Sequence, residues 1–177
     1  MLNEIIVRPI KRKDVEQYIN LKNIVWRNAY SHIFPEEVFL LREKSIDNMV
    51  KDFLNNDYIN PMQFNYVAEH NGRIVGILSG KLHSDYEYFK MNNYAELMAV
   101  YILPEYQGKG IASRLKNLFI DWLKENNVKK YVIGVLRDNR KARDVYENWG
   151  CELSDYSQPF VKLGVEYSEV FYTSVVN

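Results

Sequence analysis

The chain has 177 residues with 23 basic and 23 acidic side chains, so its formal net charge is zero and its sequence pI is about 6.8. This length suffices for one domain with a substantial core, and we expect residues 1–177 to form a single domain. The balanced charge lacks the basic excess that nucleic-acid binding usually leaves, so no nucleic-acid partner is expected.

Cysteine usage and the N-terminal residues bear on location. Cys151 is the single cysteine and cannot form an internal disulfide, which fits a reducing compartment. The N-terminal residues include the charged Glu4 and Arg8 and continue into Lys11-Arg12-Lys13, unlike the apolar region of a signal peptide. The sequence also lacks an apolar run of about 18 residues, as a membrane span requires. We expect a cytoplasmic protein with no membrane partner.

The N-terminal third begins with a strand pattern and continues with helical patterns. Residues 5–7 are an apolar strand that Pro9 ends, and apolar side chains recur at helical spacing over 13–30. Pro35 followed by two acidic residues is typical of a helix start. The intermittent apolar stripe after it predicts a second helical stretch to about residue 54.

The middle of the chain predicts a hairpin, a loop and a strand. Two strand patterns over 64–69 and 73–82 flank His70-Asn71-Gly72, and Asn-Gly is a strong signal for a two-residue hairpin turn. Residues 84–94 are polar and aromatic, and we expect them to form a loop that faces the substrate. Residues 96–103 form the next strand.

An anion site is predicted directly after that strand. Pro104 stops the strand, and Gly108 and Gly110 precede a helical pattern that starts at Ile111. Glycines let backbone amides approach a ligand closely, and the first turn of a helix carries unpaired N–H groups with partial positive charge. A phosphate or pyrophosphate is the natural ligand of such a turn. The alternative is a glycine turn that binds nothing.

The spacing of this segment argues against two common phosphate motifs. A P-loop places its lysine after the second glycine, whereas Lys109 lies between the two glycines here. The dinucleotide fingerprint requires a third glycine, and Ser113 occupies that place.

The C-terminal half alternates strands and helices. The clearest helix of the chain starts at Ile111, has apolar residues on one face, and ends at Asn126-Asn127. The elements expected after it are a strand at 131–136, a helix capped by Asp138 or Asn139 and stopped by Gly150, and a hairpin of 160–163 and 167–175. A strand, loop, helix and second strand in this order predict at least two parallel strands. The whole pattern indicates an α+β domain with a mixed sheet.

Two motifs carry a resemblance to a known family. Gln107-Gly108-Lys109-Gly110-Ile111-Ala112 matches Gln/Arg-x-x-Gly-x-Gly/Ala, and Asn139 to Gly150 matches Asn-x-x-Ala-x-x-x-Tyr-x-x-x-Gly. Over residues 95–150 the chain resembles the GNAT superfamily of acetyl-CoA-dependent N-acetyltransferases, except that Cys151 replaces an aromatic residue. The resemblance implies an α+β fold whose mixed, largely antiparallel central sheet has a splayed parallel strand pair and helices on both faces.

The resemblance also implies roles for individual residues. Acetyl-CoA would be the acyl-donor substrate, and no metal would be needed. Tyr146 would give a proton to the departing thiolate, although the residues alone leave a core tyrosine as the alternative. Coenzyme A would be bound by strand backbone, loop, helix start and second motif, namely by Val100, Tyr101, Ile102, Gln107, Gly108, Lys109, Gly110, Ile111, Ala112, Ser113, Asn139 and Tyr146.

A protonated amine must lose a proton before it can attack, so a general base is expected. Glu96 is the first candidate, because it opens the strand before the loop and matches a place where many family members carry a catalytic glutamate. The alternatives are a solvated acid at a strand end, or a base at His83, Asp85 or Glu87.

The amine acceptor stays open at this point. A small polyamine-like or antibiotic-like amine competes with a protein amine, and Trp26, Tyr30, Asp85 and Tyr88 are candidate contributors to its cleft. A non-catalytic acyl-CoA-binding sensor is the alternative from another class. A homodimer is compatible with the fold that the resemblance implies.

Overall fold

The computed structural model describes residues 5–176, and these residues divide into two compact units. The first unit contains the residues up to Gly80 together with Ala99–Trp122. The second unit contains Lys81–Met98 and the residues from Leu123 onward.

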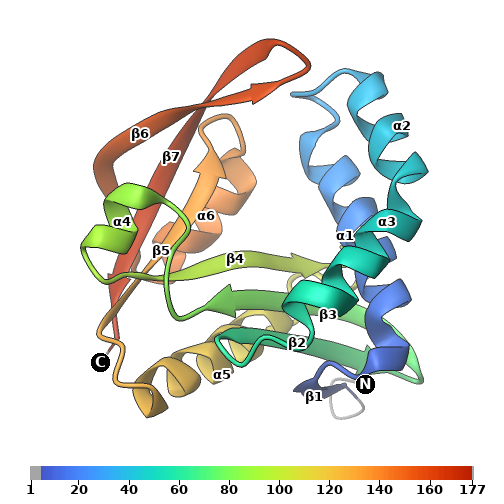
Figure 1. The fold of residues 1–177 in the computed structure, drawn as a ribbon, viewed down its shortest axis with the longest axis horizontal. Helices are drawn as coiled ribbons and strands as arrows, with labels where there is room; N and C mark the ends of the chain where they lie inside the picture. The colour runs from blue at the N-terminus through green and yellow to red at the C-terminus, as the bar shows by residue number, and fades with distance from the viewer. Residues whose placement is uncertain (1–4, 177) are drawn as a thin grey trace. The chain divides into compact units, whose positions relative to one another are not determined.

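Within residues 5–176, seven strands form a sheet in the order β1-β2-β3-β4-β5-β7-β6 (Figure 1). The strands are β1 Ile6–Pro9, β2 Gln63–His70, β3 Arg73–Lys81, β4 Ala95–Ile102, β5 Lys130–Leu136, β6 Glu152–Lys162 and β7 Val165–Val175. β4 and β5 are parallel, whereas β1 with β2, β5 with β7 and β6 with β7 are antiparallel. The prediction of an α+β fold with a mixed, largely antiparallel sheet and a parallel pair is confirmed.

The helical segments are η2 Arg12–Asp14, α1 Val15–Tyr30, α2 Glu36–Lys44, α3 Ile46–Asp52, the π-helical turn η3 Phe53–Asp57, α4 Glu87–Met91, η4 Pro104–Tyr106, α5 Ile111–Glu125 and α6 Arg140–Asn148. Among residues 5–176, no helix combines the length and the apolar character that crossing a membrane requires.

In the first unit, helices cover both faces of β2 and β3 (Figure 1). On one face the Phe64 ring lies 5.7 Å from Phe119 of α5. On the other face Ser79 donates to Asn65 Oδ1 at 2.8 Å, and Asn65 donates to the Asp57 carbonyl at 3.3 Å. Because both faces are covered, β3 reads as a continuous buried run instead of an alternating one.

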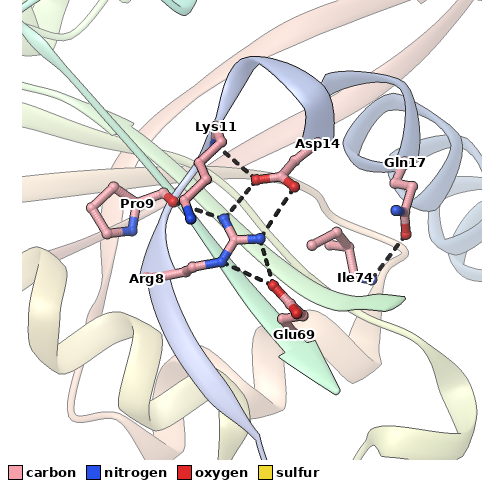
Figure 2. A network of polar contacts seen from close by, with 7 residues as sticks. All are labelled: Arg8, Pro9, Lys11, Asp14, Gln17, Glu69 and Ile74. Atoms are coloured by element: carbon pink, nitrogen blue, oxygen red, sulfur yellow. Dashed lines mark hydrogen bonds and ion pairs between the residues drawn. The ribbon is translucent and has the colours of Figure 1, made fainter. Parts of the chain in front are cut away.

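An arginine ties the start of the chain to this layer (Figure 2). The Arg8 guanidinium donates to both Asp14 oxygens, at 2.6 and 3.1 Å, and to Glu69 Oε2 at 2.5 and 2.9 Å. The hydrogen bond from Arg8 is the largest cause that lowers the pKa of Asp14. Asp14 also accepts from the Lys11 backbone N–H at 2.8 Å. Residues of β1, β2 and the entry to α1 are therefore joined by charge-assisted hydrogen bonds.

The second unit holds an aromatic cluster and the long β6–β7 hairpin. Phe89, Val132 and Phe171 are fully buried, and Tyr86, Tyr94 and Tyr156 pack against them. Tyr86 donates to Glu169 Oε1 at 2.9 Å, so a polar contact extends this cluster to β7.

Three predicted elements differ from the structure. The helical stretch after Pro35 breaks at Ser45, whose hydroxyl donates to the Leu41 carbonyl at 2.8 Å in competition with helical pairing. The expected loop 84–94 contains α4, because the buried Phe89 gives that turn a hydrophobic anchor. β6 begins at Glu152 instead of near 160, and a register shift between Leu153 and Ser157 obscures its alternation.

A methyl group at Gly76 is expected to destabilise the first unit. A Cβ there would lie 2.7 Å from Ile102 Cδ1 and 3.3 Å from Ile111 Cγ2, so Gly76→Ala overpacks the sheet–α5 interface. We expect a loss of about 1–3 kcal/mol in the free energy of unfolding, measured by urea denaturation. Adding Ile102→Val removes the nearest methyl and should restore part of the loss. If the double variant recovers none of the lost stability, the strain does not come from the contact with the Ile102 methyl.

Candidate active site

The loop between β4 and α5 has the backbone geometry of an anion site. η4 begins at Pro104, and the chain then extends through Gln107, whose Nε2 donates to the Ile102 carbonyl at 2.9 Å. Gly108 and Gly110 have φ of +73° and +77°, the left-handed region that side chains with a Cβ disfavour. The two glycines therefore allow the turn that leads into α5.

The first turn of α5 follows this loop without a break. Arg114 N donates to the Gly110 carbonyl at 3.1 Å, so the amides of Ile111, Ala112 and Ser113 precede the first intrahelical bond. Such amides, at the positive end of a 15-residue helix, are suited to an anion. All seven predicted loop residues, 107–113, lie in this one segment.

Two cations, Lys109 within this segment and Arg114 directly after it, make contacts that help to hold it. Lys109 donates to the Glu105 carbonyl at 2.8 Å, and its ammonium lies 4.9 Å from the centre of the Tyr106 ring. Arg114 donates to the Ile5 carbonyl at 3.2 Å. Lys109 therefore stabilises the loop, and Arg114 connects the start of α5 to the backbone at Ile5.

Glu96 is buried and specifically held. It lies at the start of β4 with a relative exposure of 6%. Its Oε2 accepts from the Ser84 hydroxyl and from the Asp85 backbone N–H, each at 2.9 Å. Lys81 Nζ lies 4.0 Å from the same oxygen and is ion-paired with Asp85. The alternative of a solvated acid at a strand end is therefore wrong.

Burial is the main influence on the acidity of Glu96. It raises the pKa of the carboxyl above its ordinary value, while the Asp85 N–H, Lys81 and Ser84 oppose the rise. A buried carboxyl with a raised pKa is suited to accept a proton near neutral pH. The other candidate bases, His83, Asp85 and Glu87, are all exposed.

The second motif builds a capped helix. Asn139 Oδ1 accepts from Ala142 N at 3.2 Å, which identifies Asn139 as the N-cap of α6. At the other end, Gly150 has a φ of +79°, and Cys151 N donates to the Tyr146 carbonyl at 3.0 Å. The predicted cap and stop are confirmed.

Tyr146 lies on the buried side of α6, with a relative exposure of 8%. Its ring centre is 5.8 Å from that of Tyr172 and 5.9 Å from that of Trp149. Tyr172 in turn donates to Glu147 at 2.5 Å and accepts from Arg143 at 3.1 Å. These contacts fix the orientation of the Tyr146 ring. They are made by other residues than Lys81, Ser84 and Asp85, which hold Glu96.

Three candidate contributors to the acceptor cleft, Trp26, Tyr30 and Tyr88, lie in aromatic clusters. In the first unit, the Trp26 ring lies 5.1 Å from both Tyr30 and Phe34. In the second unit, Tyr88 stacks on Tyr156 with ring centres 4.6 Å apart. In the first unit, Val100, Tyr101 and Ile102 form the end of β4.

Pairing between β4 and β5 is short. Among the described residues, the register pairs Ala95 with Tyr131 and Glu96 with Val132, and it extends no further along β4.

Sequence reasoning missed the residues that hold Glu96. Lys81 and Ser84 are both buried, at 8% and 1% exposure. Polar residues that directly follow a continuous apolar strand are a signal that would have found them. A search of residues 5–176 gives no cluster of three or more His, Cys, Asp or Glu that is suited to a metal ion.

Comparison with protein families agrees with this geometry. Residues 22–151, which include both motifs at 107–112 and 139–150, match the acetyltransferase (GNAT) family. The match covers more than half of the chain, and the chain belongs to the acetyltransferase (GNAT) family.

Individual relatives are distant. N-alpha-acetyltransferase 30 of Schizosaccharomyces pombe is 25% identical over 122 residues, which cover 68% of this chain and 79% of the relative. Two solved structures share the fold. One is the paia N-acetyltransferase of Thermoplasma acidophilum in complex with coenzyme A, with a TM-score of 0.68, 21% identity and coverage of 94% and 97% of the two chains. The other is yncA of Salmonella typhimurium with acetyl-CoA, with a TM-score of 0.71, 20% identity and coverage of 99% and 95%.

Proposed function

We propose that this protein transfers the acetyl group of acetyl-CoA to a primary amine by direct attack in a ternary complex, with residues 1–177 acting as one domain. The observation that carries the proposal is the loop 107–113, where two left-handed glycines lead into the unpaired amides of α5. These amides would bind the pyrophosphate of coenzyme A. The solved relatives with coenzyme A and acetyl-CoA support this ligand.

The end of β4 would hold the rest of the donor. Backbone groups of Val100, Tyr101 and Ile102 would pair with the pantetheine amides as an added strand does, and the short β4–β5 register supports this. Asn139 would add a hydrogen bond through its amide group. One backbone N–H at this strand end would also polarise the thioester carbonyl.

Two side chains of the second unit would move protons. Glu96 takes a proton from the acceptor ammonium, directly or through water, and the free nitrogen then attacks the thioester carbon. A C–N bond forms and the C–S bond breaks, while Tyr146 gives its phenolic proton to the leaving sulfur and the second proton of the attacking nitrogen passes to water. The products are the acetylated amine and the free thiol, and exchange with solvent returns both side chains to their starting states.

The acceptor is proposed at the level of a primary amine, from a small polyamine-like or antibiotic-like molecule or from a protein. The name of the Schizosaccharomyces pombe relative, an N-alpha-acetyltransferase, favours the protein amine. A non-catalytic acyl-CoA-binding sensor is the second candidate, because the loop 107–113 alone serves that function as well.

Thermal stability with acetyl-CoA tests the proposal. At about 100 times Kd, a ligand that binds only the folded protein adds about 2.7 kcal/mol. For a chain of this length the corresponding rise in Tm is roughly 5–10 °C. Acetyl-pantetheine, which lacks the pyrophosphate, is the control and should give a much smaller rise. Equal shifts, or none, would leave the loop as a structural turn. A shift without thiol release from any amine would favour the sensor.

A further inference from the structure

Two cations of the first unit, Lys22 on α1 and Arg42 on α2, lie close enough for their charges to interact. Arg42 Nη2 donates to Asn23 Oδ1 at 2.9 Å, and its guanidinium carbon lies 4.2 Å from the centre of the Trp26 ring. Arg42 Nε is buried and has no hydrogen-bond partner among the described residues. Both cations are half-buried, and within residues 5–176 neither lies within ion-pair distance of an acid, although cations removed from solvent are usually paired.

The nearby acids are already used. Glu43 lines the same hollow as Asn23 and Arg42. Its carboxylate, however, accepts from Arg27 at 2.7 and 3.0 Å, and Arg27 also binds Glu36 at 2.7 and 2.8 Å. Both of these acids are therefore taken by Arg27.

Electrostatics show the cost of this arrangement. Burial lowers the pKa of Lys22, and the positive charge of Arg42 lowers it further, while Asp57 acts in the opposite direction. Burial also lowers the pKa of Arg42. Asp57 is shared, because its Oδ1 accepts from Gln63 at 2.8 Å. A further negative group would stabilise two partly desolvated positive charges that share one acid.

The position of this pair relates it to the proposed donor site. Tyr101 lies close enough to Arg42 for an electrostatic interaction, and Tyr101 is in the segment of β4 where we propose that pantetheine binds. A negative group held by Arg42 would therefore lie near the strand that presents the acetyl group. Arginine suits this role, since its planar guanidinium binds carboxylates through two parallel hydrogen bonds.

We propose that Lys22, Asn23 and Arg42 bind a carboxylate of the amine acceptor. The inference rests on the proposed acetyl transfer and narrows its substrate to amines that carry a negative charge. That charge comes from the carboxylate of a free amino acid or from an acidic side chain next to the N-terminal amine of a peptide. A polyamine would meet like charges at this site and would be a poor acceptor.

Binding of acetylated products tests the site without requiring turnover. In an NMR titration, the Arg42 Nε–H signal should shift with N-acetylglycine or with N-acetylaspartyl-alaninamide. The neutral partners, N-acetylglycinamide and N-acetylasparaginyl-alaninamide, should bind roughly 10- to 100-fold more weakly, as expected when a hydrogen-bonded charge is lost. The stronger of the two carboxylate ligands identifies the source. Equal binding of charged and neutral ligands, or binding of inorganic phosphate alone, would overturn the proposal.

Substitutions then locate the selectivity. Arg42→Gln should remove the preference for the carboxylate in product binding and in kcat/KM with the matching amines. Lys44→Gln, an exposed cation two residues along the chain, should leave the preference unchanged. If Arg42→Gln fails to fold, Lys22→Gln provides the same comparison. An unaltered preference in the Arg42 or Lys22 variant would place the selectivity elsewhere. If acetyl-CoA does not raise the Tm of the wild-type protein, acetyl transfer itself is refuted, whatever the result of the product-binding titration.

Discussion

Replacement of Tyr146 by phenylalanine should lower kcat by roughly 10²-fold or more, the contribution expected of a general acid. The change removes one oxygen and keeps the ring. The ring packs against Tyr172 and Trp149 and is buried, so the fold should persist. Because the donor is proposed to bind mainly through the loop 107–113 and β4, its Kd should change little. Thiol release in a single turnover, together with acetyl-CoA titration, measures the two effects separately.

Tyr172→Phe is the matched control for this variant. It removes a phenol from the neighbouring ring, together with its hydrogen bonds to Glu147 and from Arg143. We expect a loss of about 1.5–3 kcal/mol in stability, as for hydrogen bonds to charged groups, and kcat close to that of the wild type. Normal turnover by Tyr146→Phe would remove Tyr146 from the mechanism. An equal loss in both variants would indicate disturbed packing instead of a missing proton donor.

Local sequence chemistry made several parts of the structure predictable. Asn71 and Gly72 have φ of 51° and 79°, as the predicted hairpin turn requires, because few other residues adopt this conformation without strain. Gly108 and Gly110 follow the same reasoning in the anion loop. The cap at Asn139 was predictable as well, since its side chain acts on an amide three residues away. Each of these features depends on a few consecutive residues.

Features that depend on distant residues were not predictable in this way. The position of Glu96 could be read from the sequence, but its burial and its bond to Ser84, twelve positions earlier, could not. The contact of Arg42 with Asn23 joins two helices across 19 positions. Such contacts follow from how the elements pack, and no local pattern encodes them.

Glu96→Gln should lower kcat by about 10²-fold or more near neutral pH, because glutamine cannot accept the proton of the amine. The wild-type rate should fall as pH drops through the pKa of Glu96. The ordinary pKa of a glutamate is about 4.3. Because burial raises the pKa of Glu96, the acidic limb should lie above that value. The variant should lose this limb. An unaltered pH–rate profile would assign the base to another group.

The same substitution should also change how the stability of the protein depends on pH. The pKa of Glu96 is raised in the folded state, so the fold favours the protonated carboxyl. This contribution is fully present below the unfolded pKa and is lost as pH rises through the folded pKa. Wild-type protein should therefore lose stability relative to Glu96→Gln as the pH rises from about 4 through the folded pKa of Glu96. Ion pairing of Lys81 with Asp85 keeps that cation partnered in the variant.

Urea denaturation of both proteins over this pH range measures the difference, with Glu87→Gln as the control. Glu87 is an exposed glutamate on α4, and its substitution should leave the pH dependence of stability close to that of the wild type. A difference between wild type and Glu96→Gln that stays constant with pH would show that Glu96 is not desolvated. Because this readout does not require a substrate, it tests the buried carboxyl independently of its catalytic role.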